Sequence, residues 1–263
     1  MWWMSFQRKL QRGPSSPADI SLLEAPLAFV HIPKTAGTSF VRYLESHLPA
    51  GSIAPPFLGD FSAIQISDPS KKLFWGHFRF DDMSRYLPNA KYLTFLRDPI
   101  ARSYSQYKSW HDPRNFPQDD PWRKIMTPEQ IDDVEFAQKV SFDEFVSGAR
   151  PRFEMQLRDV QTVMLSHRPA GTSEFLLSAK HNLQGMFFFG IVEDFDKSIS
   201  QLQKKLFGLR SYTVPTELEN RSDGRKLSLS SKGEERLVEL LQNDIELYKF
   251  AVELFCERKK QAL

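Results

Sequence analysis

The sequence predicts an α/β protein with a central, mainly parallel sheet flanked by helices. Three apolar runs lack polar alternation, as do strands that are buried on both faces of a parallel sheet: Leu27–Ile32, Tyr92–Leu96 and Met186–Val192. Each run is followed by a short turn and a helical pattern, which is the repeat of βα units. The chain has 263 residues, 41% of them hydrophobic. That is enough for one sizeable core, so we expect a single domain over 1–263, with 1–24 as a lead-in.

Composition excludes several classes of protein. The net charge of +2 is too mild for a nucleic-acid groove, and no apolar run is long enough to cross a membrane. Cys256 is the sole cysteine, so neither an intrachain disulfide nor a cysteine metal site can form. We expect no metal, because no Asp/Glu/His cluster has the spacing of ligands. The apolar start at 1–4 is too short for a secretory signal, which favours a cytoplasmic protein.

The first strand leads into a loop suited to an anion. The segment from Pro33 to Ser39 contains Lys34, Gly37 and three hydroxyl residues, and an amphipathic helical pattern follows. A helix start has unpaired N–H groups and partial positive charge, and small side chains let an anion approach them. The lysine precedes the glycine, so the loop differs from the usual ATP-binding fingerprint. The alternative is an ordinary turn whose Ser and Thr residues cap the helix.

The same arrangement recurs after Tyr92–Leu96. Arg97 stands at the strand end, Asp98 and Pro99 suit a helix start, and Ser105 lies about two turns further along. Because ligands of open α/β sheets bind at the carboxyl ends of strands, Arg97 and Ser105 predict a second oxyanion site. An ion pair between Arg97 and Asp98 or another acid is the alternative.

A candidate general base follows another apolar run. Leu73–Phe80 predicts a strand that ends near Gly76, which brings His77 to the same sheet edge as the two anion loops. A histidine can accept a proton from a sugar hydroxyl near neutral pH. The alternatives are a hydrogen-bonded core histidine, or a base provided by Asp81 or Asp82.

HIPKTAGTSF at 31–40 and FLRDPIARSYSQY at 95–107 together resemble the two cofactor motifs of carbohydrate sulfotransferases of the heparan sulfate 2-O-sulfotransferase type. The resemblance implies a P-loop-like sulfotransferase fold, the donor 3′-phosphoadenosine 5′-phosphosulfate (PAPS), the product PAP and a carbohydrate acceptor. It implies 3′-phosphate contacts from Arg97 and Ser105. It also implies contacts to the 5′-phosphosulfate from six residues: Lys34, Thr35, Ala36, Gly37, Thr38 and Ser39.

The resemblance also suggests catalytic roles. His77 matches the family's catalytic histidine in a Gly-His pair, and Lys34 would stabilise the transferring group. Trp75 stands where the 2-O enzymes have a further histidine, which leaves the acceptor sugar open. A polar loop at 220–226 matches a segment that closes over the adenosine phosphate, and it offers three more cofactor candidates: Arg221, Ser222 and Arg225. A surface turn is the alternative for this loop.

Further segments complete the prediction. The loop 111–127 offers Arg114, Trp122, Arg123 and Lys124 either as acceptor contacts or as a solvated face. Ser141 with Glu144 forms a capping box before a short helix. Further helices are expected over the ranges Phe153–Leu165, Ser173–Leu183, Glu193–Phe207 and Ser230–Lys260.

We therefore expect a PAPS-dependent sulfotransferase acting on a carbohydrate hydroxyl, in a cytoplasmic and bacterial member of the family. Two other classes stay open: a catalytically silent nucleotide-binding protein that keeps both anion sites, and a kinase of the P-loop type. The oligomeric state is also open, and a homo-oligomer is compatible with the sequence.

Overall fold

The computed structural model describes residues 25–57, 66–115, 123, 126–148, 150–207 and 229–261. These residues form two compact units. The strand unit contains the described residues of 25–98, 160–207 and 243–261, and the helical unit those of 99–159 and 229–242. The expectation of a single domain stays a prediction, and each unit is described by itself.

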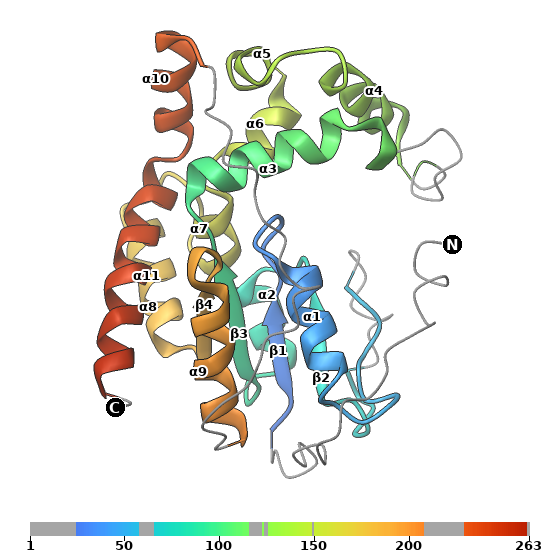
Figure 1. Ribbon diagram of the computed structural model, residues 1–263, viewed down its shortest axis with the longest axis vertical. Coiled ribbons are helices and arrows are strands. Elements are labelled where there is room, and N and C mark those ends of the chain that lie inside the picture. The colour runs from blue at the N-terminus through green and yellow to red at the C-terminus, as the bar shows by residue number, and fades with distance from the viewer. Residues whose placement is uncertain are drawn as a thin grey trace. The chain divides into compact units, whose positions relative to one another are not determined.

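The strand unit is built on a four-stranded sheet in the order β2-β1-β3-β4 (Figure 1). The strands are β1 (Leu27–Val30), β2 (Leu73–Gly76), β3 (Lys91–Leu96) and β4 (Phe188–Ile191). Every pairing is parallel; Val30, for example, lies between Gly76 and Thr94 in the register. The predicted parallel sheet is therefore confirmed, and its strands are buried because helices cover both faces.

Two apolar layers sandwich this sheet. On one face, α1 (Gly37–Glu45) and α9 (Phe195–Phe207) pack against inward side chains of all four strands. The other face is covered by four helices, namely α2 (Phe80–Tyr86), α7 (Val160–Leu165), α8 (Phe175–Gly185) and α11 (Gln242–Gln261). Figure 1 shows the blue α1 and the orange α9 alongside the strands.

The helical unit contains no strand among its described residues. Its elements are α3 (Pro99–His111), the 3₁₀ turn η4 (Pro113–Asn115), α4 (Pro128–Ala137), α5 (Phe142–Ser147), α6 (Pro151–Leu157) and α10 (Ser231–Leu240). Phe145 and Phe153 stack with ring centroids 4.4 Å apart in its core. The predicted capping box of Ser141 and Glu144 is present at the start of α5.

Two predicted helices are each divided in the structure. The expected helix 153–165 ends at Leu157 and restarts at Val160, because Asp159 takes a left-handed φ of 45°. The expected helix 230–260 is interrupted at Leu241, which leaves the helical region with φ −109° and ψ 12°. In both places the chain passes between the helical unit and the strand unit. Apolar residues keep their helical spacing across both breaks, so the sequence pattern does not reveal where either helix is interrupted.

Within the described ranges, no helix is both long enough and apolar enough to cross a lipid bilayer.

Candidate anion-binding and catalytic site

The carboxyl ends of the four strands bring the candidate residues to one edge of the sheet. His77 directly follows β2, the loop with Lys34 follows β1, Arg97 follows β3, and Glu193 lies two residues after β4. Because β2 lies beside β1 and β1 lies beside β3, His77 follows a strand next to that of the Lys34 loop, and Arg97 follows the strand on its other side. This is the edge at which parallel α/β sheets bind ligands.

The loop after β1 takes an unusual backbone course into α1. Lys34 and Ala36 have left-handed φ values of 71° and 60°, which non-glycine residues adopt at a cost. Ala36 is the N-cap of α1, and no side chain caps the helix start. The Thr35 hydroxyl donates to the Ile32 carbonyl at 2.9 Å, so it holds the loop itself. The first N–H groups of α1 thus have no capping side chain, as an anion site requires.

The remaining loop residues differ in exposure. Thr38 is exposed, whereas Ser39 is buried in the first turn of α1. Gly37 is the first helical residue, and the imidazole of His31 lies against it: a Cβ added at Gly37 would come within 2.0 Å of the ring. A side chain at this position would displace either the ring or the helix start.

His77 has one ring nitrogen fixed by the backbone. Its Nδ1 lies 2.7 Å from the carbonyl oxygen of His31, and a carbonyl only accepts, so Nδ1 carries the proton. In the neutral ring the lone pair is then on Nε2. The residue as a whole is exposed, so a substrate can reach the ring. This is the tautomer that a general base needs.

His31 and His77 form a close pair of rings. Their centroids lie 4.5 Å apart, and His31 also stacks on Phe29 at 5.4 Å. Burial lowers the pKa of His31 well below its ordinary value, and the charges of His77 and Lys34 lower it further. Partial burial lowers the pKa of His77 too; the bond to the His31 carbonyl opposes this shift, and the Lys34 charge adds to it. Both rings are therefore neutral near pH 7.

Gly76 explains how His77 is presented. Gly76 has a φ of 146°, and a Cβ there would lie 2.6 Å from the backbone nitrogen of Phe57. Only glycine accommodates both the conformation and this close approach. The strand therefore turns at Gly76 and is followed at once by His77, as the sequence predicted for the end of this strand.

Arg97 is fixed through its main chain and its side chain. The amide of Gln161 pairs with both main-chain groups: Arg97 N–H donates to Oε1 at 2.9 Å, and Nε2 donates to the Arg97 carbonyl at 2.8 Å. Its Nη1 donates to the Lys34 carbonyl at 3.2 Å, so the arginine reaches the loop after β1. Its buried Nε has no hydrogen-bond partner within the described residues. That N–H is therefore an unsatisfied donor among the described residues.

Glu193, an acid near Arg97, is held by other groups. Glu193 accepts the Asp98 N–H at 3.0 Å through one carboxylate oxygen and the Tyr248 hydroxyl at 2.8 Å through the other. Burial lowers the pKa of Arg97, while the charges of Glu193 and Asp98 raise it. A guanidinium stays protonated under all such shifts. The site therefore keeps a permanent positive charge beside the loop after β1.

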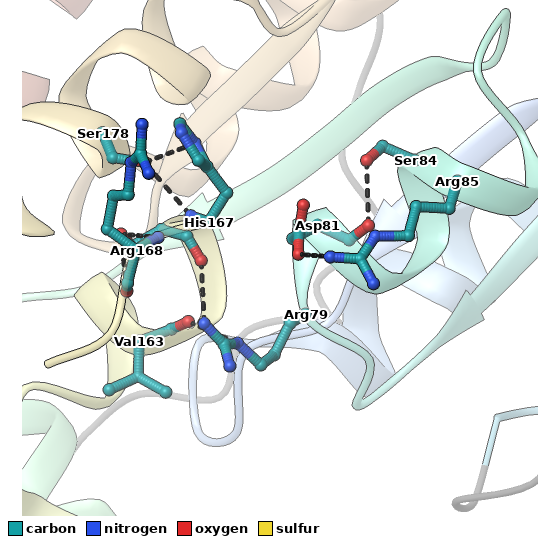
Figure 2. Close-up of polar contacts among 9 residues, drawn as sticks. Arg79, Asp81, Ser84, Arg85, Val163, His167, Arg168 and Ser178 are labelled. Atoms are coloured by element: carbon teal, nitrogen blue, oxygen red, sulfur yellow. Dashed lines mark hydrogen bonds and ion pairs between the residues drawn. The ribbon is translucent and has the colours of Figure 1, made fainter.

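Arg79 fixes α7 from the β2 side. It donates from Nε to the Val163 carbonyl at 3.2 Å and from Nη2 to the Ser166 carbonyl at 3.0 Å (Figure 2). The segment that carries His77 is thereby tied to the carboxyl end of α7, and Gln161 at the other end of α7 holds Arg97. The roles of Arg79 and Gln161 cannot be predicted from the sequence, because contacts over more than 60 residues leave no local signal.

Other predicted residues lie elsewhere. Ser105 is in α3 of the helical unit, so its pairing with Arg97 stays a prediction. Asp81, a rival base, is ion-paired with Arg85 along α2 (Figure 2). In the 111–127 loop, Arg114 pairs with Asp112 and Arg123 with Glu135. The candidates outside the described residues are Trp122, Lys124, Arg221, Ser222 and Arg225.

The fold and the site together define a parallel α/β protein with an uncapped helix start, an arginine and a histidine at one edge of its sheet. The comparison with family models then identifies the group: the chain belongs to the Sulfotransferase family, whose model matches residues 24–251. This confirms the expected class of protein.

Individual relatives are distant. The chain is 26% identical over 275 residues to heparan-sulfate 6-O-sulfotransferase 3-B of Danio rerio, covering 88% of this chain and 64% of that protein. For heparan-sulfate 6-O-sulfotransferase 3 of Homo sapiens the values are 25% over 283 residues, with 88% and 58% covered. The chain thus spans less than two thirds of either relative. These vertebrate 6-O relatives give no support to the expected 2-O subtype or to a bacterial source.

Among solved structures, mouse sulfotransferase SULT7A1 complexed with PAP is similar to 89% of this chain. The match also covers 89% of that chain, with 14% identity and a TM-score of 0.46. A likeness at this level does not bear on the ligand of this protein.

Proposed function

We propose that this protein transfers a sulfuryl group from PAPS to a hydroxyl of a carbohydrate. The observation that carries the proposal is the arrangement at one sheet edge: a tautomer-fixed histidine, an uncapped helix start and a buried arginine N–H lie at the ends of adjacent strands β2, β1 and β3. Membership of the Sulfotransferase family and the 6-O-sulfotransferase relatives support it.

The residues present fit such a donor. The uncapped start of α1, with Lys34 before it, suits the 5′ end, and the partnerless Nε of Arg97 suits a phosphate oxygen. PAPS would supply the sulfuryl group and a phosphate oxygen as its leaving group. We assign the 5′ side to the 34–39 loop and the 3′-phosphate to Arg97, with Ser105 as its predicted partner.

The chain's own residues then have defined roles. His77 Nε2 takes the proton from the acceptor hydroxyl as that oxygen bonds to sulfur, and Nδ1–H stays on the His31 carbonyl. Lys34 and the first N–H groups of α1 stabilise negative charge that grows on the sulfuryl and departing oxygens. Arg97 orients the donor through a group that does not react.

The alternatives are less consistent with the geometry. Burial of His77 away from Lys34 would favour a silent nucleotide-binding protein, whereas His77 is exposed and follows β2, the strand next to the one that leads into the Lys34 loop. A P-loop kinase should have its lysine after the last glycine of the loop, whereas Lys34 precedes Gly37. Cytoplasmic location and oligomeric state stay predictions.

The test is transfer of labelled sulfate from PAPS to a panel of glycans that includes heparan sulfate. We expect His77→Ala to lower turnover by about 10²–10⁴-fold, the usual range for a positioned acid or base, while affinity for PAP is kept. His181→Ala, at an exposed histidine of α8, is the matched control and should leave turnover unchanged. Equal turnover in the wild type and His77→Ala would refute the role of His77, and absence of transfer to any glycan would refute the acceptor class.

A further inference from the structure

Arg97 and Asp98 form the turn that follows β3, and one helix of the strand unit supports both of them. Asp244 and Tyr248 lie one turn apart on α11. Asp244 contacts the start of α7, where Gln161 holds Arg97, and Tyr248 contacts Glu193, which holds Asp98. Two hydrogen-bonded branches therefore run from α11 to consecutive residues at the strand end.

The first branch starts from two buried side chains. Asp244 and Gln161 have no exposed surface. The Asp244 carboxylate accepts the N–H of Gln161 at 3.1 Å, and the N–H and hydroxyl of Thr162 each at 2.7 Å. A carboxylate at this position satisfies the first N–H groups of α7, which has no preceding turn to do so. The start of α7, and with it the backbone of Gln161, is thus fixed.

The amide of Gln161 is the group that the contact requires. A primary amide has one acceptor and one donor side by side, so it can pair with the N–H and the C=O of a single residue, as a neighbouring strand would. Both bonds to Arg97 have ordinary hydrogen-bond lengths, 2.9 and 2.8 Å. Glutamate could replace only the acceptor, and methionine could replace neither group.

The second branch supports the next residue. Glu193 joins the Tyr248 hydroxyl to the Asp98 N–H. Burial raises the pKa of Tyr248, and its bond to Glu193 raises it further, so the hydroxyl remains a donor. Loss of this hydroxyl removes one bond and leaves the first branch intact.

We propose that Gln161 is a positioning residue for recognition of the nucleotide's 3′-phosphate: through its amide, α11 holds Arg97 at the distance from the Lys34 loop that the nucleotide requires. The proposal rests on the proposed function, since it takes Arg97 as the 3′-phosphate contact. Gln161 itself touches no ligand group. It acts through Arg97, whose main chain it fixes on both sides and whose side chain bonds to the Lys34 carbonyl.

The test compares binding of PAP with binding of 5′-AMP, which lacks the 3′-phosphate, by calorimetry on the full chain. The wild type should bind PAP much more tightly than 5′-AMP. Gln161→Met should weaken PAP binding about tenfold, the equivalent of one hydrogen bond to a fixed group, with little change for 5′-AMP. Gln203→Leu, at a glutamine of α9 that is 1% exposed, is the matched control and should keep the wild-type ratio.

The outcomes separate the two proposals. If the wild type shows no preference for PAP, the proposed function fails. If the wild type prefers PAP and Gln161→Met keeps that ratio within twofold, the positioning role is refuted while the function stands. Should Gln161→Met not fold, Gln161→Glu decides: it keeps only the acceptor, so it should lower the PAP to 5′-AMP ratio, and an unchanged ratio overturns the proposal.

Discussion

Substitution of Gly37 by alanine tests the packing of the anion loop directly. The new Cβ would lie 2.0 Å from both Cδ2 and Nε2 of His31, whereas carbon contacts are optimal at about 3.5 Å, so ring and helix must separate by roughly 1.5 Å. The ring cannot simply swing aside, because it stacks on Phe29 at 5.4 Å and lies 4.5 Å from His77. We expect the strain of an overpacked core, about 1–3 kcal/mol.

The assay is a double-mutant cycle read by thermal unfolding and by sulfate transfer. For a chain of this size, Gly37→Ala should lower Tm by about 2–4 °C per kcal/mol, and turnover should fall because the loop and His77 shift together. His31→Ala removes the opposing ring, so the double variant should regain stability relative to Gly37→Ala, with a coupling of about 1–3 kcal/mol.

Gly185→Ala provides the control, since a Cβ there meets nothing within 4 Å and the residue ends α8. Its unfolding temperature should stay at or above that of the wild type. A wild-type Tm and turnover for Gly37→Ala, or strictly additive effects of His31→Ala and Gly37→Ala, would show that the ring does not occupy this space.

Three further outcomes follow from the charges at the site. The pKa of His77 lies below its ordinary 6.5, so the ring is already neutral at pH 7. We therefore expect kcat/KM for sulfate transfer to be maximal at neutral pH and to fall only below pH 6.5. A fall that starts above pH 7 on acidification would contradict this. Native His31 binds its proton less readily than unfolded His31, so stability should be complete above pH 6.5 and decrease below it, and urea unfolding of His31→Asn should show a weaker dependence. Asp81→Asn should change stability by only about 0.3–0.5 kcal/mol and leave turnover intact, because the partner Arg85 is exposed; lost turnover would restore Asp81 as a base candidate.

Much of the fold could be predicted from the sequence because its signals are local. An apolar run that is buried on both faces, then a turn, then an amphipathic pattern specifies a βα unit without reference to the rest of the chain. The strands that precede Lys34, His77 and Arg97 were found in this way, and their parallel pairing brings these residues to one edge. The two divided helices could not be found, since the left-handed Asp159 and the irregular Leu241 interrupt no hydrophobic period.

The sequence by itself determined which residue types end the strands, and therefore the chemistry that this sheet edge can offer. Only the tertiary structure decided how those residues are held: the His31 carbonyl sets the tautomer of His77, and the buried Gln161 fixes Arg97. These bonds join segments 46 and 64 residues apart in the chain. A hydrogen bond at such separation depends on the packing of whole elements, whereas a strand, a turn or a helix start depends on its own few residues.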